Sequence, residues 1–383
     1  MAEVSTAAHV EPIRRNPGLD ALRCMAIVPV MLYHAFQSST AAEQLGFIGV
    51  DIFFVLSGFL IAGMIFERFD GVTTPAALLS FWINRWIRTL PLYFVFLLVF
   101  MWMTANHAWI SPPGTPPAGT YAFQPPIWPY ALFTQNLFTG GMAWNNGWFG
   151  PSWSLAVEEW FYLIFPLVLF AASRRHTTKA IVTFAIIALV LALGGRLYRF
   201  IQSTGLNLDD MDDLFRRPVI FRLDTFCYGI LVYAAMFRWR WPVVHHARTL
   251  FLAGAMCLIA SVSLCLHPAT NWFHAFVTYL TLTPVSVALM LPAFWRLPIG
   301  SPLLRAALAF VSTRTYALYL VHIPIIVVYR SQIGEPSALT IIPLLLLTLV
   351  AADLIYRCIE RPVLALRHRV MAARAPSATA REA

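Results

Sequence analysis

Long apolar stretches recur along almost the whole chain, and short polar segments separate them. Each stretch has the ~17–25 residues that a helix needs to cross the hydrocarbon core of a bilayer. The pattern predicts an all-α, polytopic membrane bundle of about ten transmembrane helices. Their expected positions are 19–36, 47–66, 82–104, 153–172, 180–200, 219–236, 249–266, 272–294, 306–328 and 338–358. We therefore expect one membrane domain over 19–362, preceded by an N-terminal tail (1–18) and followed by a basic tail (363–383).

Composition supports lipid as the main solvent of this chain. Hydrophobic residues make up 59% of it and charged residues 12%, whereas soluble domains average roughly 45–50% and about 25%. The net charge is +9, but the basic residues lie between apolar blocks instead of forming one basic face, which argues against nucleic-acid binding. The five cysteines fit neither a disulfide framework nor a zinc spacing, and no metal site is expected.

The distribution of basic residues predicts the orientation of the bundle. With a cytoplasmic N-terminus, few of the 27 Lys and Arg residues fall in outer segments. The outer ones are Arg196, Arg199, Arg216, Arg217, Arg222 and Arg330. By the positive-inside rule both termini should be cytoplasmic, and the protein should be a multi-pass protein of the inner (plasma) membrane.

Two outer loops have unusual compositions. The loop from Thr104 to Ser152 carries no Asp, Glu, Lys or Arg and is rich in Trp, Tyr, Pro and Gly. Its aromatics suit either an interfacial belt or a surface on which sugars stack. The other loop holds four aspartates over 209–213, beside Arg216 and Arg217. Self-pairing in water explains these charges, and a cation site is the alternative.

The first span contains two ionisable residues, Arg23 and His34. Their separation corresponds to about 1100° of helix, only ~20° more than three full turns, so both lie on one face about 16 Å apart. An imidazole can deprotonate a hydroxyl or act as a nucleophile. His34 is therefore a candidate catalytic base, and a packing histidine is the alternative.

Asp51, at the outer end of the second span, should lie at nearly the depth of His34. It could orient the imidazole or cap the helix. Ser57 and Gly58 follow on the same span, and close helix packing explains them better than a nucleophile does.

The third and fourth spans add further charges. Arg85 and Arg88 lie one turn apart near the cytoplasmic end, where they could bind the phosphates of a nucleotide or of lipid. Glu158 and Glu159 are adjacent near an outer helix edge, after Trp153. One carboxylate is expected to pair within the bundle, and the other to meet a substrate hydroxyl or His34.

Later spans contribute three more buried polar candidates. Arg222 and Asp224 begin the sixth span and suggest a structural ion pair. His322 is a second intramembrane histidine, for which a structural role is favoured.

Five segments resemble the acyltransferase-3 family of membrane acyltransferases. They are Leu19 to Arg23 with Leu32 to His34, Gly46 to Phe59, Arg85 to Arg88 with Pro91 and Tyr93, Ser152 to Glu159, and Ile359 to Pro362. The segments occur in the family's order and cover nearly the whole chain. The chain departs from the usual pattern at Ala21, Cys24, Asn84 and Trp160, none of which is a residue given a chemical role.

The resemblance implies a ten-helix fold and acyl-CoA, usually acetyl-CoA, as a co-substrate with no permanently bound cofactor. It implies that His34 is catalytic with Arg23 in support, and that Arg85 and Arg88 serve the CoA side. Carbohydrates, glycolipids and macrolides are the implied acceptors. No extracytoplasmic hydrolase-like domain is appended, so the chain is expected to act alone or with a separate partner.

The sequence thus predicts an O-acyltransferase in which His34, Asp51 and Glu158 carry the chemistry and Arg23, Arg85 and Arg88 bind acyl-CoA. The residues expected to support the acceptor or the site are Ser57, Trp153, Glu159, Arg222, Asp224 and His322. The alternative is a transporter or flippase of a lipid-linked glycan, whose buried charges would line its path.

Overall fold

The computed structural model describes residues 15–36, 41–68, 72–106, 126–138, 149–172, 177–202, 212–266 and 272–366. Most of both tails, most of the uncharged outer loop, and Asp209 and Asp210 lie outside these ranges, so the expectations for them stay predictions. The helices that correspond to the predicted spans are α1 (Pro17–Phe36), α2 (Ala41–Arg68), α3 (Pro75–Ala105), α5 (Ser152–Ala172), α6 (Thr177–Gln202), α8 (Leu223–Tyr233), α9 (Ala247–Leu266), α10 (Trp272–Arg296), α11 (Pro302–Gln332) and α12 (Ile341–Ile355).

Short elements extend or connect these helices. The 3₁₀ turn η5 (Val219–Phe221), α8 and the π-helix η6 (Ala234–Arg238) together form the sixth span. The π-helix η8 (Tyr356–Glu360) extends α12. The others are α4 (Trp128–Ala131), η4 (Asp212–Arg216) and η7 (Pro242–Val244). In the described part of the chain, nine helical segments are long and apolar enough to cross a membrane, and α10 occupies the position of the remaining predicted span.

The local sequence explains where several helices begin. The Thr74 side chain accepts a hydrogen bond from the Ala77 amide, and Pro75 occupies the first turn of α3. Ser301 and Pro302 begin α11 in the same way. A hydroxyl cap satisfies an amide that has no partner within the helix, and proline has no amide hydrogen to leave unsatisfied there.

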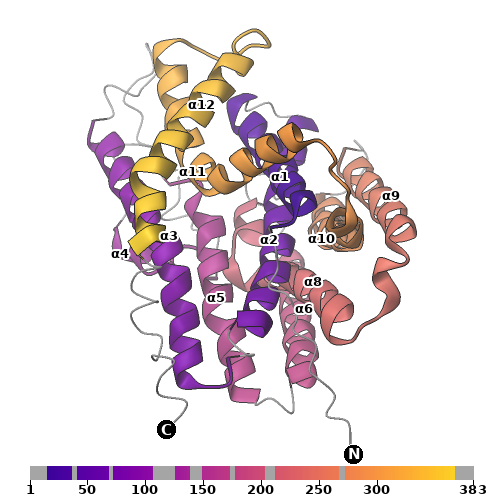
Figure 1. Cartoon of the computed structure of the whole chain (residues 1–383). Coiled ribbons are helices and arrows are strands. Elements are labelled where there is room, and N and C mark those ends of the chain that lie inside the picture. Colours follow the sequence, from indigo (N-terminus) through magenta and orange to yellow (C-terminus); the bar gives the residue numbers. More distant parts are fainter. Residues whose placement is uncertain are drawn as a thin grey trace, which may run out of the picture.

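The helix α2 is the centre of the bundle, with α1, α5, α8 and α10 around it (Figure 1). Its contact with α8 is close because two glycines face the partner backbone. A Cβ atom on Gly58 would lie 2.1 Å from the carbonyl oxygen of Phe226, and one on Gly229 would lie 1.9 Å from that of Val55. The sequence-based interpretation of Gly58 as a close-packing residue is confirmed, since small residues let helix backbones approach.

Apolar side chains on the outer helices point away from the protein. Leu252, Met256 and Ile259 of α9 and Leu346 and Val350 of α12 are all more than half exposed. Such surfaces are stable in hydrocarbon, where apolar exposure carries no penalty. The chain is therefore a multi-pass membrane protein.

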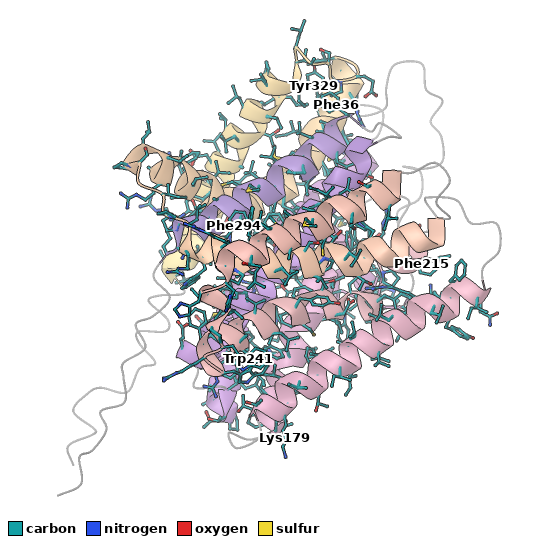
Figure 2. The ribbon with its side chains drawn as sticks, turned by 90° about the vertical axis from the view of Figure 1, so that its right-hand side faces the viewer. Phe36, Lys179, Phe215, Trp241, Phe294 and Tyr329 are labelled. Atoms are coloured by element: carbon teal, nitrogen blue, oxygen red, sulfur yellow. The ribbon has the colours of Figure 1, made fainter. Side chains whose placement is uncertain are left out.

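The described ends of the chain lie at the same end of the bundle. Arg15, just before α1, and Arg361, just after η8, line one surface depression. Phe36 and Tyr329 lie together at one end of the molecule, and Lys179 and Trp241 lie at the opposite end (Figure 2). This arrangement is compatible with the predicted topology, while the side of the membrane that each end faces stays a prediction.

Candidate active site

A cavity of about 390 Å³ opens between α1, α2, α3, α5 and α11. Along α2 it extends from Glu67 to Val50, a distance of about 25 Å at the helical rise per residue. Arg15 and Asn16 line it near the start of α1, and Ser154 and Tyr319 line it at the start of α5 and within α11. A space of this length suits an elongated ligand.

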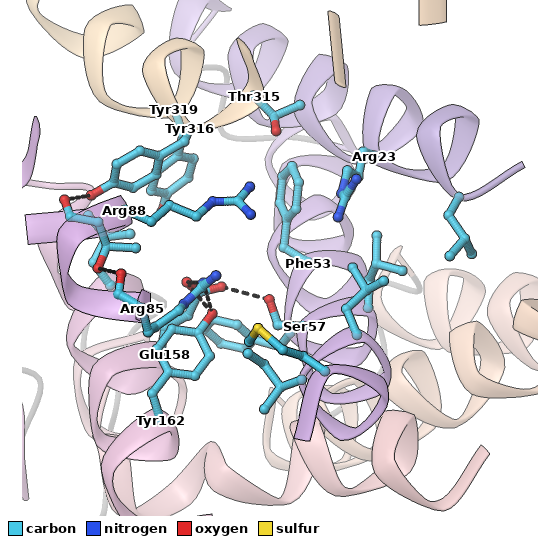
Figure 3. Close-up of a pocket in the computed structure, with 18 of the residues that line it drawn as sticks. Arg23, Phe53, Ser57, Arg85, Arg88, Glu158, Tyr162, Thr315, Tyr316 and Tyr319 are labelled. Atoms are coloured by element: carbon cyan, nitrogen blue, oxygen red, sulfur yellow. Dashed lines mark hydrogen bonds and ion pairs between the residues drawn. The ribbon is translucent and has the colours of Figure 1, made fainter. Parts of the chain in front are cut away.

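Two arginines point into this cavity from opposite walls, Arg23 from α1 and Arg88 from α3 (Figure 3). The Arg88 side chain is exposed to the cavity, and no hydrogen bond or ion pair joins it to any residue that the structure describes. Glu360 of η8 acts on it only electrostatically. Arg88 therefore has its donors available for an anionic ligand.

Arg23 is held in place by a residue that sequence analysis did not single out. Asp20, one turn earlier and buried, lies 3.5 Å from the Arg23 guanidinium and accepts a 2.7 Å hydrogen bond from Arg15. Ser312 of α11 donates to the same carboxylate and lies 3.4 Å from Arg23. The i,i+3 spacing of Asp20 and Arg23 was the available signal.

Arg85 belongs to a polar network, unlike Arg88. Its guanidinium donates to the Tyr162 hydroxyl and lies 3.7 Å from Glu158 Oε2. Tyr162 and Ser57 each donate a 3.0 Å hydrogen bond to Glu158. Figure 3 shows this cluster on the cavity wall. Glu158 thus has one strong partner and two hydroxyl donors, which hold it as a fixed carboxylate facing the cavity.

The two adjacent glutamates point in different directions. Glu159 is buried and accepts a 2.9 Å hydrogen bond from Thr89 of α3. The ring of Trp153, six residues earlier, packs against the Arg216 guanidinium, which lies 4.6 Å from the ring centre. Both residues therefore support the walls of the site in this structure, and Glu158 alone of the three lines the cavity.

His34 lies beyond the end of the cavity and is not one of its lining residues. Its ring centre is 5.1 Å from that of His322, which is 5.8 Å from that of Tyr319. Tyr319 lines the cavity and shares a hydrogen bond with Ser154. A continuous row of side chains, Tyr319, His322 and His34, therefore leads from the cavity to the predicted base.

His322 is fully buried between these neighbours. Its Nδ1 lies 3.1 Å from the Leu318 carbonyl oxygen, and its Nε2 has no hydrogen-bond partner within the described structure. A buried nitrogen without a partner is costly and needs a reason. Sequence analysis favoured a purely structural role for His322, because its proximity to His34 comes from helices far apart in the sequence.

Asp51 contacts Arg222 in this structure. The two side chains form a fully buried ion pair in which Arg222 donates to Asp51. Asp224 instead pairs with Arg196 of α6 at 3.1 Å. The expected Arg222–Asp224 ion pair is thus wrong. Arg222, just before α8, contacts α2, whereas Asp224, two residues later, contacts α6.

These features define a polytopic membrane protein with a charged cavity inside its helical bundle. The family model described as "Acyltransferase domain", that of the acyltransferase-3 family, matches residues 16–357. The chain therefore belongs to this family, as the sequence motifs predicted.

The chain is also similar to several curated proteins. It is 27% identical to O-acetyltransferase OatA of Staphylococcus aureus (strain NCTC 8325 / PS 47), over 91% of this chain and 57% of the relative. It is 29% identical to the "Putative peptidoglycan O-acetyltransferase YrhL" of Bacillus subtilis (strain 168), over 91% and 55%. The chain thus spans little more than half the length of these relatives. No solved structure matches it significantly.

Proposed function

We propose that this protein transfers an acetyl group from acetyl-CoA to a hydroxyl of a cell-envelope carbohydrate, with His34 as general base. The observation that carries the proposal is the cavity itself. Arg88 lines it without an ion-pair partner among the described residues, and the cavity ends beside a row of side chains that leads to His34. The names of the relatives, O-acetyltransferases in both cases, support this class of reaction.

In this proposal acetyl-CoA enters from the cytoplasmic end, and its acyl arm extends along α2 towards Tyr319. Arg88 and Arg23 provide positive charge for donor phosphates or for the thioester oxygen. Glu158, fixed by Ser57 and Tyr162, holds the Arg85 side of the cavity wall in place. Fixed dipoles and charges stabilise a developing oxyanion better than mobile water does, because they need no reorganisation.

The proposed reaction is the transfer of the acetyl group from the thioester to the acceptor hydroxyl. The acceptor hydroxyl gives its proton to His34 as its oxygen attacks the thioester carbonyl. The carbon–sulfur bond then breaks, and the thiolate of CoA takes up a proton, so the products are the ester and free CoA thiol. The row His34, His322 and Tyr319 offers a route for the proton from the outer hydroxyl towards the leaving thiolate.

Release of free CoA thiol tests this function. The purified protein in lipid discs would be given acetyl-CoA with and without an envelope glycan extract. His34→Ala should lower acceptor-dependent release by at least about 10²-fold, whereas His245→Ala, at an exposed histidine outside the site, should release thiol at the wild-type rate. Full activity of His34→Ala would contradict its role as base, and no release from folded wild type would favour the transporter alternative.

A further inference from the structure

A second hollow, a depression of about 510 Å³, lies where the described ends of the chain meet. It is lined by Arg15, two residues before α1, by the first half of α11, and by η8 with the residue after it. Four of its nine lining residues are arginines: Arg15, Arg314, Arg357 and Arg361. Neither the family match nor the names of the relatives assigns a role to it.

One aspartate organises two of these arginines. Asp353 of α12 lies 2.6 Å from the Arg314 guanidinium and 2.9 Å from that of Arg357. Arg314 is buried and stacks over the rings of Phe310 and Tyr356, at 3.6 and 4.7 Å. It is thereby fixed as part of the wall, and cation–π contacts of this kind hold a guanidinium in one plane.

The depression keeps an excess of positive charge after these pairs are formed. Asp353 balances one of the four arginines, and Asp20 balances Arg15 in part while it also contacts Arg23. Arg357 uses its Nε on Asp353 and is 61% exposed, and Arg361, one turn further on, is exposed as well. Guanidinium groups with free Nη atoms bind phosphate oxygens in pairs.

The depression also adjoins the cavity. Arg15 lines both of them, and the η8 segment that carries Arg357 packs against α3, which carries Arg88. A single ligand can therefore have its acyl arm in the cavity and its nucleotide end in the depression. Acyl-CoA has this form, because its thioester lies at the far end of a long arm from its nucleotide phosphates.

We propose that the depression binds the phosphorylated nucleotide end of the acyl-CoA donor, with Arg357 and Arg361 on its 3′-phosphate. The inference rests on the proposed function and adds to it the residues that select the donor. The same phosphate chemistry occurs in anionic lipid headgroups, which arginines at a membrane edge also bind. The experiment below separates the two sources.

The test compares the affinities of CoA and dephospho-CoA, which lacks only the 3′-phosphate. Titration calorimetry would use the full chain in discs of zwitterionic phosphatidylcholine. Wild type should bind CoA about 10- to 100-fold more tightly than dephospho-CoA, as expected for hydrogen bonds between charged groups. The double variant Arg357→Gln/Arg361→Gln should bind the two nucleotides equally, with unchanged affinity for dephospho-CoA. The matched control Arg240→Gln/Arg248→Gln changes two exposed arginines outside the depression. It should keep the wild-type ratio of the two affinities.

Two results would overturn the inference while leaving the proposed function intact. One is a double variant that still prefers CoA to the wild-type extent. The other is a double variant that loses only its preference for discs containing phosphatidylglycerol, which would make the depression a lipid headgroup site. If wild type bound neither nucleotide and released no thiol, the proposed function itself would fail, and the inference with it.

Discussion

The bundle contains two groups of intramembrane charges that are arranged in opposite ways. Between α2, α6 and α8, Asp51 pairs with Arg222 and Asp224 with Arg196, and all four side chains are almost completely buried. Around the cavity, Arg23, Arg88 and Glu158 keep part of their surface accessible to a ligand. The charges of the first group pair with one another, whereas those of the second group face the cavity.

The difference separates charges that are closed off from a ligand from charges that line a cavity. The two buried pairs join α2, α6 and α8, and none of their four residues lines the cavity. The glycine contact between Gly229 and Val55 brings α8 and α2 together beside the Asp51–Arg222 pair and leaves little room there. Other residues of α2, among them Val50, Ser57 and Ile61, line the cavity.

The largest expected effect follows from breaking the closed group. Asp51→Leu leaves the Arg222 guanidinium buried without its partner, which should cost about 3–5 kcal/mol of stability. Thermal unfolding in detergent would measure the loss, and the double variant Asp51→Leu/Arg222→Met should recover most of it. If the double variant folds but transfers no acetyl group, Asp51 or Arg222 contributes to the reaction and not only to stability.

The next effect concerns the inner end of the cavity. His322→Gln removes the imidazole between Tyr319 and His34, so kcat should fall by about 10²-fold. The KM for acetyl-CoA should stay unchanged, because His322 does not line the cavity. If the variant instead yields less folded protein, and that protein has the wild-type kcat, His322 has only a packing role.

The open end of the cavity should respond differently. Arg88→Gln removes a guanidinium that has no ion-pair partner in the described structure, so stability should change by less than about 0.5 kcal/mol. The KM for acetyl-CoA should rise about tenfold or more, because a charge-assisted contact is lost. Steady-state kinetics against donor concentration would measure it, and an unchanged KM would place the donor elsewhere.

The smallest effect is expected at an ion pair that belongs to neither group. Arg330 and Glu335 lie 3.1 Å apart, and the Glu335 side chain is 74% exposed. Glu335→Gln should change the unfolding free energy by no more than about 1 kcal/mol, since solvent screens exposed pairs. A loss as large as that of Asp51→Leu would show that burial is not what divides the two groups.

The helical part of the fold was predictable because each span satisfies its own backbone hydrogen bonds. The first, fourth and seventh spans were predicted to within two residues at each end. The third was predicted too short, since α3 begins seven residues before the predicted start, where Thr74 caps it. The 3₁₀ and π turns around α8 carry no signal in apolar length, so the sixth span was predicted as one plain helix.

The site was predictable only as separate residues. Arg23 and His34 share a helix, so their common face follows from the helical repeat alone. The contact of His322 with His34, the anchoring of Arg85 by Tyr162, and the role of Asp20 depend on neighbouring helices. The partners of Arg222 and Asp224 were mispredicted for the same reason.

The sequence by itself determined that this chain is a multi-pass helical membrane protein of the acyltransferase-3 family, because span length, apolar content and family motifs are local properties. Only the tertiary structure decided which charges face one another and where a hollow remains. Those features depend on how closely each pair of helices packs, and that distance is set by side chains from both partners at once. Sequence order alone does not bring Arg15, Arg88 and Tyr319 to the wall of one cavity.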